Sequence, residues 1–218
     1  IRHMKLWHCA DARSFRPLWA LEALGLTYAL ELLPFPPRFL KPEYLQTNPL
    51  GTIPFFEDGA THMTESAAIV EYLATRYRGQ GAVDLAVDVA GPDYGAWLNW
   101  LHYGEATLTF PQTLVLRYTR LEPEERRQPK VAADYARWFV KRTVAVENAL
   151  AGGNDWLCAG RFTAADISVG YALLLANTLG LGDELAPVVQ DYWQRLKSAP
   201  GFVGAKAAQR GASAIPAV

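Results

Sequence analysis

The sequence has few cysteines, almost no net charge and no long apolar run, and each shortage excludes a class of protein. Cys9 and Cys158 are the only cysteines among 218 residues, which excludes a disulfide framework and predicts a reducing compartment, the cytoplasm. The 21 basic and 22 acidic residues leave a net charge of −1, which gives no indication of a nucleic-acid partner. Because no run of eighteen apolar residues is present, we expect no membrane-spanning helix.

The first eighty residues instead alternate short strand and helix signals. Residues 5–9 and 28–33 are predicted strands. The apolar spacing of residues 14–24 predicts a helix that ends at Gly25. The proline-rich segment 34–42 is not expected to continue a regular element, since proline fixes φ and lacks an amide hydrogen.

A hairpin and a helix complete this first region. Residues 52–63 are predicted to form two strands that turn at Asp58-Gly59, a favoured two-residue turn between apolar runs. An apolar helix follows and is expected to begin at Glu65 and Ser66. Strands and helices in this order predict a small α/β domain over residues 4–78.

Beyond a glycine-rich linker, residues 78–86, every strong signal is helical. Residues 93–120 predict a long helix that kinks at Pro111. Thr163 and Asp166 have the spacing of a capping box before an apolar run. The further predicted helices are residues 131–150, 163–180 and 186–198. We therefore predict that an all-helical domain, residues 88–212, follows the α/β domain.

The pair Glu65-Ser66 allows two interpretations. In the first, Ser66 or Thr64 simply caps the helix, because a hydroxyl there accepts from a free backbone amide. In the second, the positive end of the helix and Ser66 hold a ligand carboxylate, while Glu65 pairs with an ammonium group. An α-amino acid group would then be bound at both of its charged ends.

The sequence before this helix is compatible with the second interpretation. Ile53 precedes Pro54 at the start of a predicted strand, where proline is tolerated. A cis Ile53-Pro54 bond would turn the backbone of Ile53 outward, and a free strand edge could pair with an extended peptide. A trans bond is the commoner alternative at such a position.

Several stretches together resemble the cytosolic glutathione transferase superfamily. They are "RSFRPLWALEALGL", "NPLGTIPFFEDG" followed by "MTESAAIVEYLATRY", and "GRFTAADISVGYALL". "WLHYGEATLTFP" is similar to a bacterial and fungal branch of that family. The resemblance covers essentially the whole chain. It implies a thioredoxin-like N-terminal domain, a helical-bundle C-terminal domain and a homodimer in the cytoplasm.

The resemblance also implies how glutathione, the co-substrate, would bind. Ile53, next to Pro54, would hold the cysteinyl backbone, and Glu65 and Ser66 would take the γ-glutamyl end. No metal is implied. The expected reaction is a detoxification step, in which the glutathione thiolate is transferred to a small hydrophobic electrophile.

The residue that would activate the thiol is not evident, since the family uses Tyr, Ser or Cys between the first strand and helix. Here this region reads "WHCADARSFR" and has no tyrosine. Asp11-Ala12 stands where serine-type members carry their hydroxyl, and Arg13 where cysteine-type members carry their thiol. Ser14 is the nearest hydroxyl, either a catalytic donor or the cap of the helix. Arg13 could stabilise a thiolate by charge, and nearby amides could contribute.

Other candidates complete the predicted site. Arg38 or Lys41, near the proline-rich segment, could pair with the glycyl carboxylate of glutathione. Side chains of the second domain could line a hydrophobic pocket for the second substrate, although aromatic residues on helices more often form core. These pocket candidates are Tyr103, Phe110, Leu114 and Tyr118.

Two alternatives to a transferase remain. Cys9 could form a mixed disulfide with glutathione in a peroxidase or disulfide reductase, although a cysteine at a strand end is commonly buried. The absence of a standard catalytic residue would also fit a non-catalytic protein that binds glutathione or a protein partner. Of Trp7 and His8, we expect one in the core and the other facing the cleft.

Overall fold

The computed structural model describes residues 3–211, and these form two compact units. Of the described residues, one unit contains 3–86 together with 198–211. The other contains Val87–Lys197. The segment after Lys197 therefore packs with the first unit, although the predicted second domain, residues 88–212, includes it.

The first unit is built on a four-stranded sheet in the order β2-β1-β3-β4. β1 (Met4–His8) pairs in parallel with β2 (Ala29–Leu32) and antiparallel with β3 (Phe55–Asp58), which pairs with β4 (Thr61–Met63). A mixed sheet of this kind, with α1 crossing between its two parallel strands, confirms the predicted α/β class and the thioredoxin-like arrangement.

The observed hairpin differs from the predicted one by a residue. Asp58 pairs with Thr61, so the two turn residues are Gly59 and Ala60 rather than Asp58-Gly59. Gly59 has φ of +61°, a conformation that glycine adopts without steric cost. The turn thus forms around the same glycine, but the strand β3 extends one residue further than predicted.

The proline-rich segment is more regular than predicted. It contains the short helix α2 (Pro37–Leu40) and a 3₁₀ helix, Pro42–Gln46. In both, a proline occupies the first turn, where its missing amide hydrogen would have no helical partner. Proline therefore starts these turns rather than preventing them, which the sequence analysis did not anticipate.

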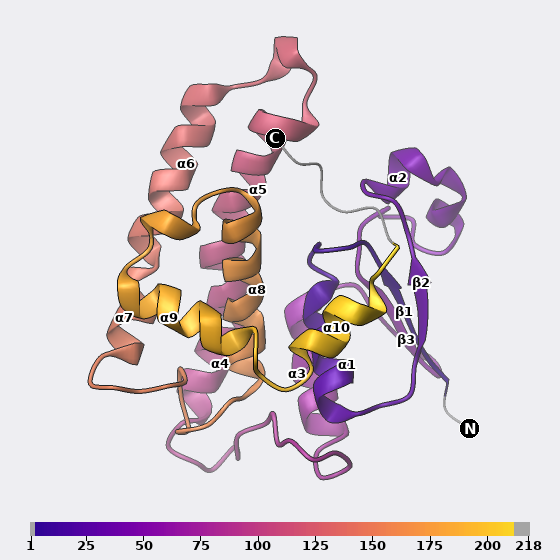
Figure 1. Cartoon of the computed structure of the whole chain (residues 1–218). Coiled ribbons are helices and arrows are strands. Elements are labelled where there is room, and N and C mark those ends of the chain that lie inside the picture. The colour runs from indigo at the N-terminus through magenta and orange to yellow at the C-terminus, as the bar shows by residue number, and fades with distance from the viewer. Residues whose placement is uncertain (1–2, 212–218) are drawn as a thin grey trace. The chain divides into compact units, whose positions relative to one another are not determined.

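Helix α1 (Phe15–Leu24) packs against β1, and α3 (Ser66–Arg76) and α10 (Phe202–Ala208) pack against α1 (Figure 1). Helix α10 was not predicted, because its seven residues form no extended apolar period. Its Phe202 ring packs against the Trp19 ring at a centroid distance of 5.1 Å. Trp19 also donates from Nε1 to the carbonyl of Pro200 at 2.8 Å. These contacts fasten the C-terminal helix to α1.

The long helix predicted over residues 93–120 is interrupted in the structure. α4 (Tyr94–His102) continues into a π-helical segment, Tyr103–Thr109, and then α5 (Phe110–Leu116), which ends in a second π-helical turn, Arg117–Leu121. The first π-helical segment ends at Thr109, two residues before Pro111, which cannot donate a helical hydrogen bond. The helical type therefore changes close to the proline at which a kink was predicted.

Four more helices complete the second unit. The predicted helix 131–150 is divided at Thr143 into α6 (Pro129–Arg142) and α7 (Val144–Leu150). α8 (Ala164–Thr178) is almost entirely buried, and α9 (Pro187–Leu196) follows it. None of the helices within residues 3–211 is long and apolar enough to cross a membrane.

The capping box predicted for α8 is confirmed. The Thr163 hydroxyl accepts from the Ala165 amide at 3.2 Å, and the Asp166 carboxylate accepts from the Thr163 amide at 3.0 Å. Two amides that would otherwise lack partners at the start of a buried helix are thus satisfied.

Candidate functional site

The start of helix α3 holds the pair that the sequence analysis singled out. Glu65 occupies the N-cap position and Ser66 the first helical position. Within residues 3–211, neither side chain makes a capping hydrogen bond to this helix. Instead, the Ser66 oxygen accepts from Arg16 Nη1 at 3.1 Å, and the side chains of Ser66 and Arg16 are buried. The simple capping interpretation is therefore not what the structure shows.

The Arg16–Ser66 contact has a chemical consequence for a ligand. Arginine only donates, so the Ser66 oxygen must accept in this hydrogen bond. The hydroxyl hydrogen of Ser66 can then be donated to a third group. With a buried guanidinium behind it and a helix N-terminus around it, Ser66 is placed to donate to an anion.

Glu65 supplies the opposite charge beside this anion position. Its side chain is exposed, and one carboxylate oxygen accepts from the Thr64 hydroxyl at 3.2 Å. The Glu65 carboxylate suits a ligand cation, and the position beside Ser66, one residue further on, suits a ligand anion. This arrangement matches the ammonium and carboxylate of an α-amino acid group.

Ile53 lies in a buried cluster at the end of the sheet. The Ile53-Pro54 peptide bond is cis, the isomer that the sequence could not decide. Ile53 is 9 % exposed and packs with side chains from the β1–α1 turn, including Cys9 and Ala12. The structure thus brings the predicted Ile53 position and the predicted thiol-activating region together.

The β1–α1 turn, residues 9–14, has no hydroxyl at the position of the serine-type members. Asp11-Ala12 is the stretch predicted for that position, and Ala12 is buried. Asp11 adopts a left-handed backbone with φ of +55°, and Arg13 is half-buried just before α1. A guanidinium in this turn is a charge that could stabilise a thiolate.

Ser14 does not occupy the position expected of a catalytic donor. It is fully buried, its oxygen lies 2.6 Å from His8 Nδ1, and it accepts from the Cys9 amide at 3.2 Å. The structure therefore favours a structural role for Ser14, because its hydroxyl is already used by β1 and the turn. The predicted helix-capping role is not observed either, since within the described chain the Ser14 side chain makes no capping hydrogen bond.

Cys9 is poorly suited to the redox alternative. It is fully buried, and its sulfur donates to the Pro34 carbonyl at 3.6 Å. Burial raises the pKa of the Cys9 thiol to about 12, so the reactive thiolate is scarce at neutral pH. His8 and Trp7, of which one was expected to face the cleft, are both buried.

The two bases proposed for the glycyl carboxylate lie around α2. Lys41 is half-buried, with its Nζ 4.0 Å from a Glu31 carboxylate oxygen. Arg38 is exposed, and its guanidinium lies 4.6 Å from the centroid of the Phe39 ring. Both side chains therefore reach solvent, where either could meet a ligand carboxylate.

The predicted second-substrate residues all lie in the second unit, within its interrupted helix. The Tyr103 hydroxyl donates to the Arg142 carbonyl of α6 at 2.6 Å, so its polar end is used within the unit. The Phe110 ring is 54 % exposed, while Leu114 and Tyr118 are half-buried. The exposed Phe110 side chain is thus the most accessible apolar contact of the four.

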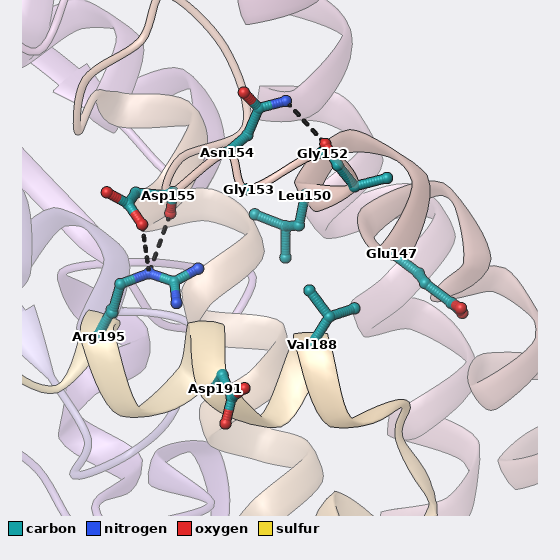
Figure 2. A pocket seen from close by; sticks show the side chains of 10 residues that line it. Glu147, Leu150, Gly152, Gly153, Asn154, Asp155, Val188, Asp191 and Arg195 are labelled. Carbon is teal, nitrogen blue, oxygen red and sulfur yellow. Dashed lines mark hydrogen bonds and ion pairs between the residues drawn. The ribbon is translucent and has the colours of Figure 1, made fainter.

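A surface pocket of the second unit lies between α7 and α9 (Figure 2). Leu150 and Val188 point toward each other there, and Arg195 donates from Nε to the Asp155 carbonyl at 3.3 Å. Among the described residues, none of the predicted site residues lines this pocket. Residues 3–211 also contain no cluster of His, Cys, Asp and Glu suited to a metal ion.

Sequence reasoning missed the contacts of three polar residues of the first unit. Arg16 is a single base on an apolar helix, and it is fully buried against Ser66. His8 and Gln209 are 201 residues apart and share a 2.8 Å hydrogen bond. A base at a core position of an apolar helix could have drawn attention to Arg16, whereas no local signal pairs His8 with Gln209.

Comparisons with known proteins point to one family. The family profile described as "Glutathione S-transferase, N-terminal domain" matches residues 2–75. The chain is 27 % identical to "Glutathione S-transferase GstA" of Escherichia coli O157:H7 over 213 residues, which cover 94 % of this chain and 98 % of that protein. It is 33 % identical over 103 residues to "Glutathione S-transferase 3" of Schizosaccharomyces pombe. That match covers 47 % of this chain and only 41 % of the yeast protein.

A solved structure supports the fold. The crystal structure of a glutathione transferase from Methylococcus capsulatus superposes with a TM-score of 0.78 at 24 % identity, covering 94 % of this chain and 98 % of that one. The likeness extends over both units taken in chain order, and so confirms an α/β domain followed by a helical domain.

Proposed function

Because this chain belongs to the cytosolic glutathione transferase superfamily, we propose that it binds glutathione and transfers its thiolate to a small hydrophobic electrophile. The observation that carries this proposal is the start of α3, where buried Arg16 donates to Ser66 beside exposed Glu65. The γ-glutamyl end of glutathione carries an α-carboxylate and an α-ammonium group, and this pair of side chains is complementary to both.

The cysteinyl and glycyl parts of glutathione would contact other residues of the first unit. We propose that the backbone next to Pro54 pairs with the cysteinyl residue through Ile53. Lys41 or Arg38 would meet the glycyl carboxylate. Because Ile53 and Ala12 belong to one buried cluster, this binding mode would place the sulfur beside the β1–α1 turn.

The sulfur must ionise for the reaction to proceed. A free thiol has a pKa of about 8.5, and lowering it by two units requires about 2.7 kcal/mol of preferential stabilisation of the thiolate. With Ala12 at the hydroxyl position and Ser14 engaged by His8, we assign this stabilisation to Arg13 and the amides at the start of α1. Loss of conjugation in Arg13→Met, with glutathione binding retained, is the expected outcome.

The second substrate and the assembly belong to the same proposal. An apolar electrophile would contact the exposed Phe110 ring, with Leu114, Tyr103 and Tyr118 nearby in sequence on the interrupted helix. We propose a homodimer in the cytoplasm, acting in detoxification. Size-exclusion chromatography with light scattering tests the dimer, and a monomer at micromolar concentration would contradict it.

One observation favours a second candidate function. Ala12 removes the hydroxyl that a serine-type transferase uses, so a peroxidase or reductase that relies on the thiol of glutathione itself, or a glutathione-binding protein without turnover, is the alternative. A version that uses the Cys9 thiolate is disfavoured by burial of that sulfur. Turnover of several electrophiles would exclude the non-catalytic alternative.

The first experiment is calorimetric titration of the protein with glutathione, repeated on Glu65→Ala. We expect a micromolar to low-millimolar dissociation constant in the wild type that weakens at least about tenfold in the variant, equivalent to about 1.4 kcal/mol. Glu71→Ala, on the same helix, is the matched control and should bind as the wild type does. Absence of binding to the wild-type protein would refute the proposed function.

A further inference from the structure

A polar network links the C-terminal segment to the β1–α1 turn. Gln209, just after α10, has its Oε1 2.8 Å from His8 Nε2, and this oxygen also accepts from the Asp11 amide at 3.2 Å. Its Nε2 donates to the Asp11 carboxylate at 2.7 Å, and Lys206 Nζ donates to the same oxygen at 2.7 Å. His8 then contacts Ser14. Gln209 is 7 % exposed and His8 is fully buried.

The Asp11 contacts determine which way the Gln209 amide points. A carboxylate only accepts and a backbone amide only donates, so Nε2 must face the Asp11 carboxylate and Oε1 the Asp11 amide. Oε1 therefore also faces His8, which must donate from Nε2. A neutral histidine with its hydrogen on Nε2 accepts at Nδ1, so the Ser14 hydroxyl donates to Nδ1. The donor and the acceptor are thereby assigned for each hydrogen bond on the path from the Asp11 carboxylate through Gln209 and His8 to Ser14.

The hydrogen-bond network stabilises the backbone of the β1–α1 turn. Asp11 has a left-handed backbone, which costs a non-glycine residue free energy and persists only when its surroundings hold it. Gln209 contacts both the amide and the carboxylate of this residue, and Ser14 fixes the other end of the turn through the Cys9 amide. The backbone of residues 11–13 is thus held from α10, a segment nearly 200 residues later in the chain.

We propose that Gln209 is a positioning residue for thiol activation, because it holds the β1–α1 turn in the conformation that presents Arg13 and its neighbouring amides to the glutathione sulfur. This inference rests on the proposed function for the identity of the ligand. Gln209 itself touches neither glutathione nor the electrophile. It acts through Asp11, with Lys206 as the second group that fixes the Asp11 carboxylate.

The test compares three full-length variants with the wild type. Gln209→Leu removes the bridge with little change in volume, and Lys206→Met removes only the outer contact to Asp11. Gln190→Leu is the matched control: Gln190 lies in α9 of the second unit, away from the network, and its side chain donates to the Leu185 carbonyl at 2.8 Å. The readouts are hydrogen exchange of the 9–14 segment without glutathione, the glutathione dissociation constant, and the pH profile of kcat/KM with an aryl halide.

We expect Gln209→Leu to speed exchange in the 9–14 segment and to raise the apparent pKa of the bound thiol by about one unit, with kcat lower by about tenfold. The dissociation constant should change less than about threefold, since Glu65 and Ser66 are untouched. Lys206→Met, whose folding is less at risk, should show the same changes to a smaller degree. The control should match the wild type throughout.

The outcomes separate the two proposals. A wild type that fails to bind glutathione refutes the proposed function, while the exchange measurement still reports whether Gln209 holds the turn. A wild type that binds and conjugates, with unchanged exchange and an unchanged thiol pKa in both variants, overturns the positioning role. Weaker glutathione binding in the variants with unchanged kcat would overturn the positioning role too, since Gln209 would then support binding rather than thiol activation.

Discussion

Replacement of Ser14 by alanine separates a structural hydroxyl from a catalytic one. The Ser14 oxygen lies 2.6 Å from His8 Nδ1 and accepts from the Cys9 amide, and the residue is fully buried. Its hydroxyl also lies 3.4 Å from the Cys9 carbonyl, and alanine removes all three contacts without adding volume. The hydrogen assignment above therefore predicts that the variant loses stability and retains activity.

The size of the stability loss follows from the groups left behind. His8 Nδ1 becomes a buried acceptor without a donor, and the Cys9 amide becomes a buried donor without an acceptor. Each such group costs about 1–3 kcal/mol, so we expect the free energy of unfolding to fall by about 3 kcal/mol. For a chain of this size, that corresponds to a decrease in Tm of about 6–12 °C.

The assay is urea unfolding together with steady-state conjugation kinetics, both well below the Tm of the variant. Ser168→Ala is the matched control in the second unit, where the hydroxyl donates to the Leu101 carbonyl at 2.6 Å, and it should lose about 1 kcal/mol. We expect kcat/KM of Ser14→Ala to fall by no more than about tenfold, because Ser14 holds one end of the β1–α1 turn but does not contact the sulfur. A fall of about a hundredfold or more, as for loss of a catalytic hydrogen-bond donor, with little change in stability would refute the structural role.

Three further predictions concern the same unit. Burial lowers the pKa of His8 to about 4 from an unfolded value near 6.5, so the folded state binds fewer protons than the unfolded state between these pH values. The free energy of unfolding should therefore fall by about 3 kcal/mol as the pH drops from 6.5 to 4. Urea titrations at each pH measure this loss, which should be absent from His8→Gln. Gly201→Ala should lower the free energy of unfolding by more than about 2 kcal/mol, because φ is +82° and the added carbon would meet the backbone of α1. Gly79→Ala, with φ of +78° and open space around the added carbon, should cost about 1 kcal/mol. Equal losses in the two variants would contradict this prediction. Cys9 should react with an aromatic disulfide reagent only at the rate of unfolding, and fast labelling of the native protein would show that the thiol is accessible.

Much of the fold was encoded locally and could be predicted. Hydrophobic spacing located α1 and the strands of the sheet, and the hydroxyl-acid spacing at Thr163 and Asp166 identified a capping box that the structure contains. These features depend on residues a few positions apart, so the sequence displays them directly. Helix α10 was missed because it is short and is stabilised by Trp19 and Phe202 packing rather than by its own periodicity.

The candidate site divides in the same way. The sequence alone determined that Glu65 and Ser66 begin a helix and that Ile53 precedes Pro54 at the start of a strand, because these signals are local. Only the tertiary structure placed Arg16 behind Ser66 and closed the path from Ser14 through His8 to Gln209. The physical reason is distance along the chain: a hydrogen bond between residues 201 positions apart leaves no periodicity or motif, and exists only once α10 packs on α1.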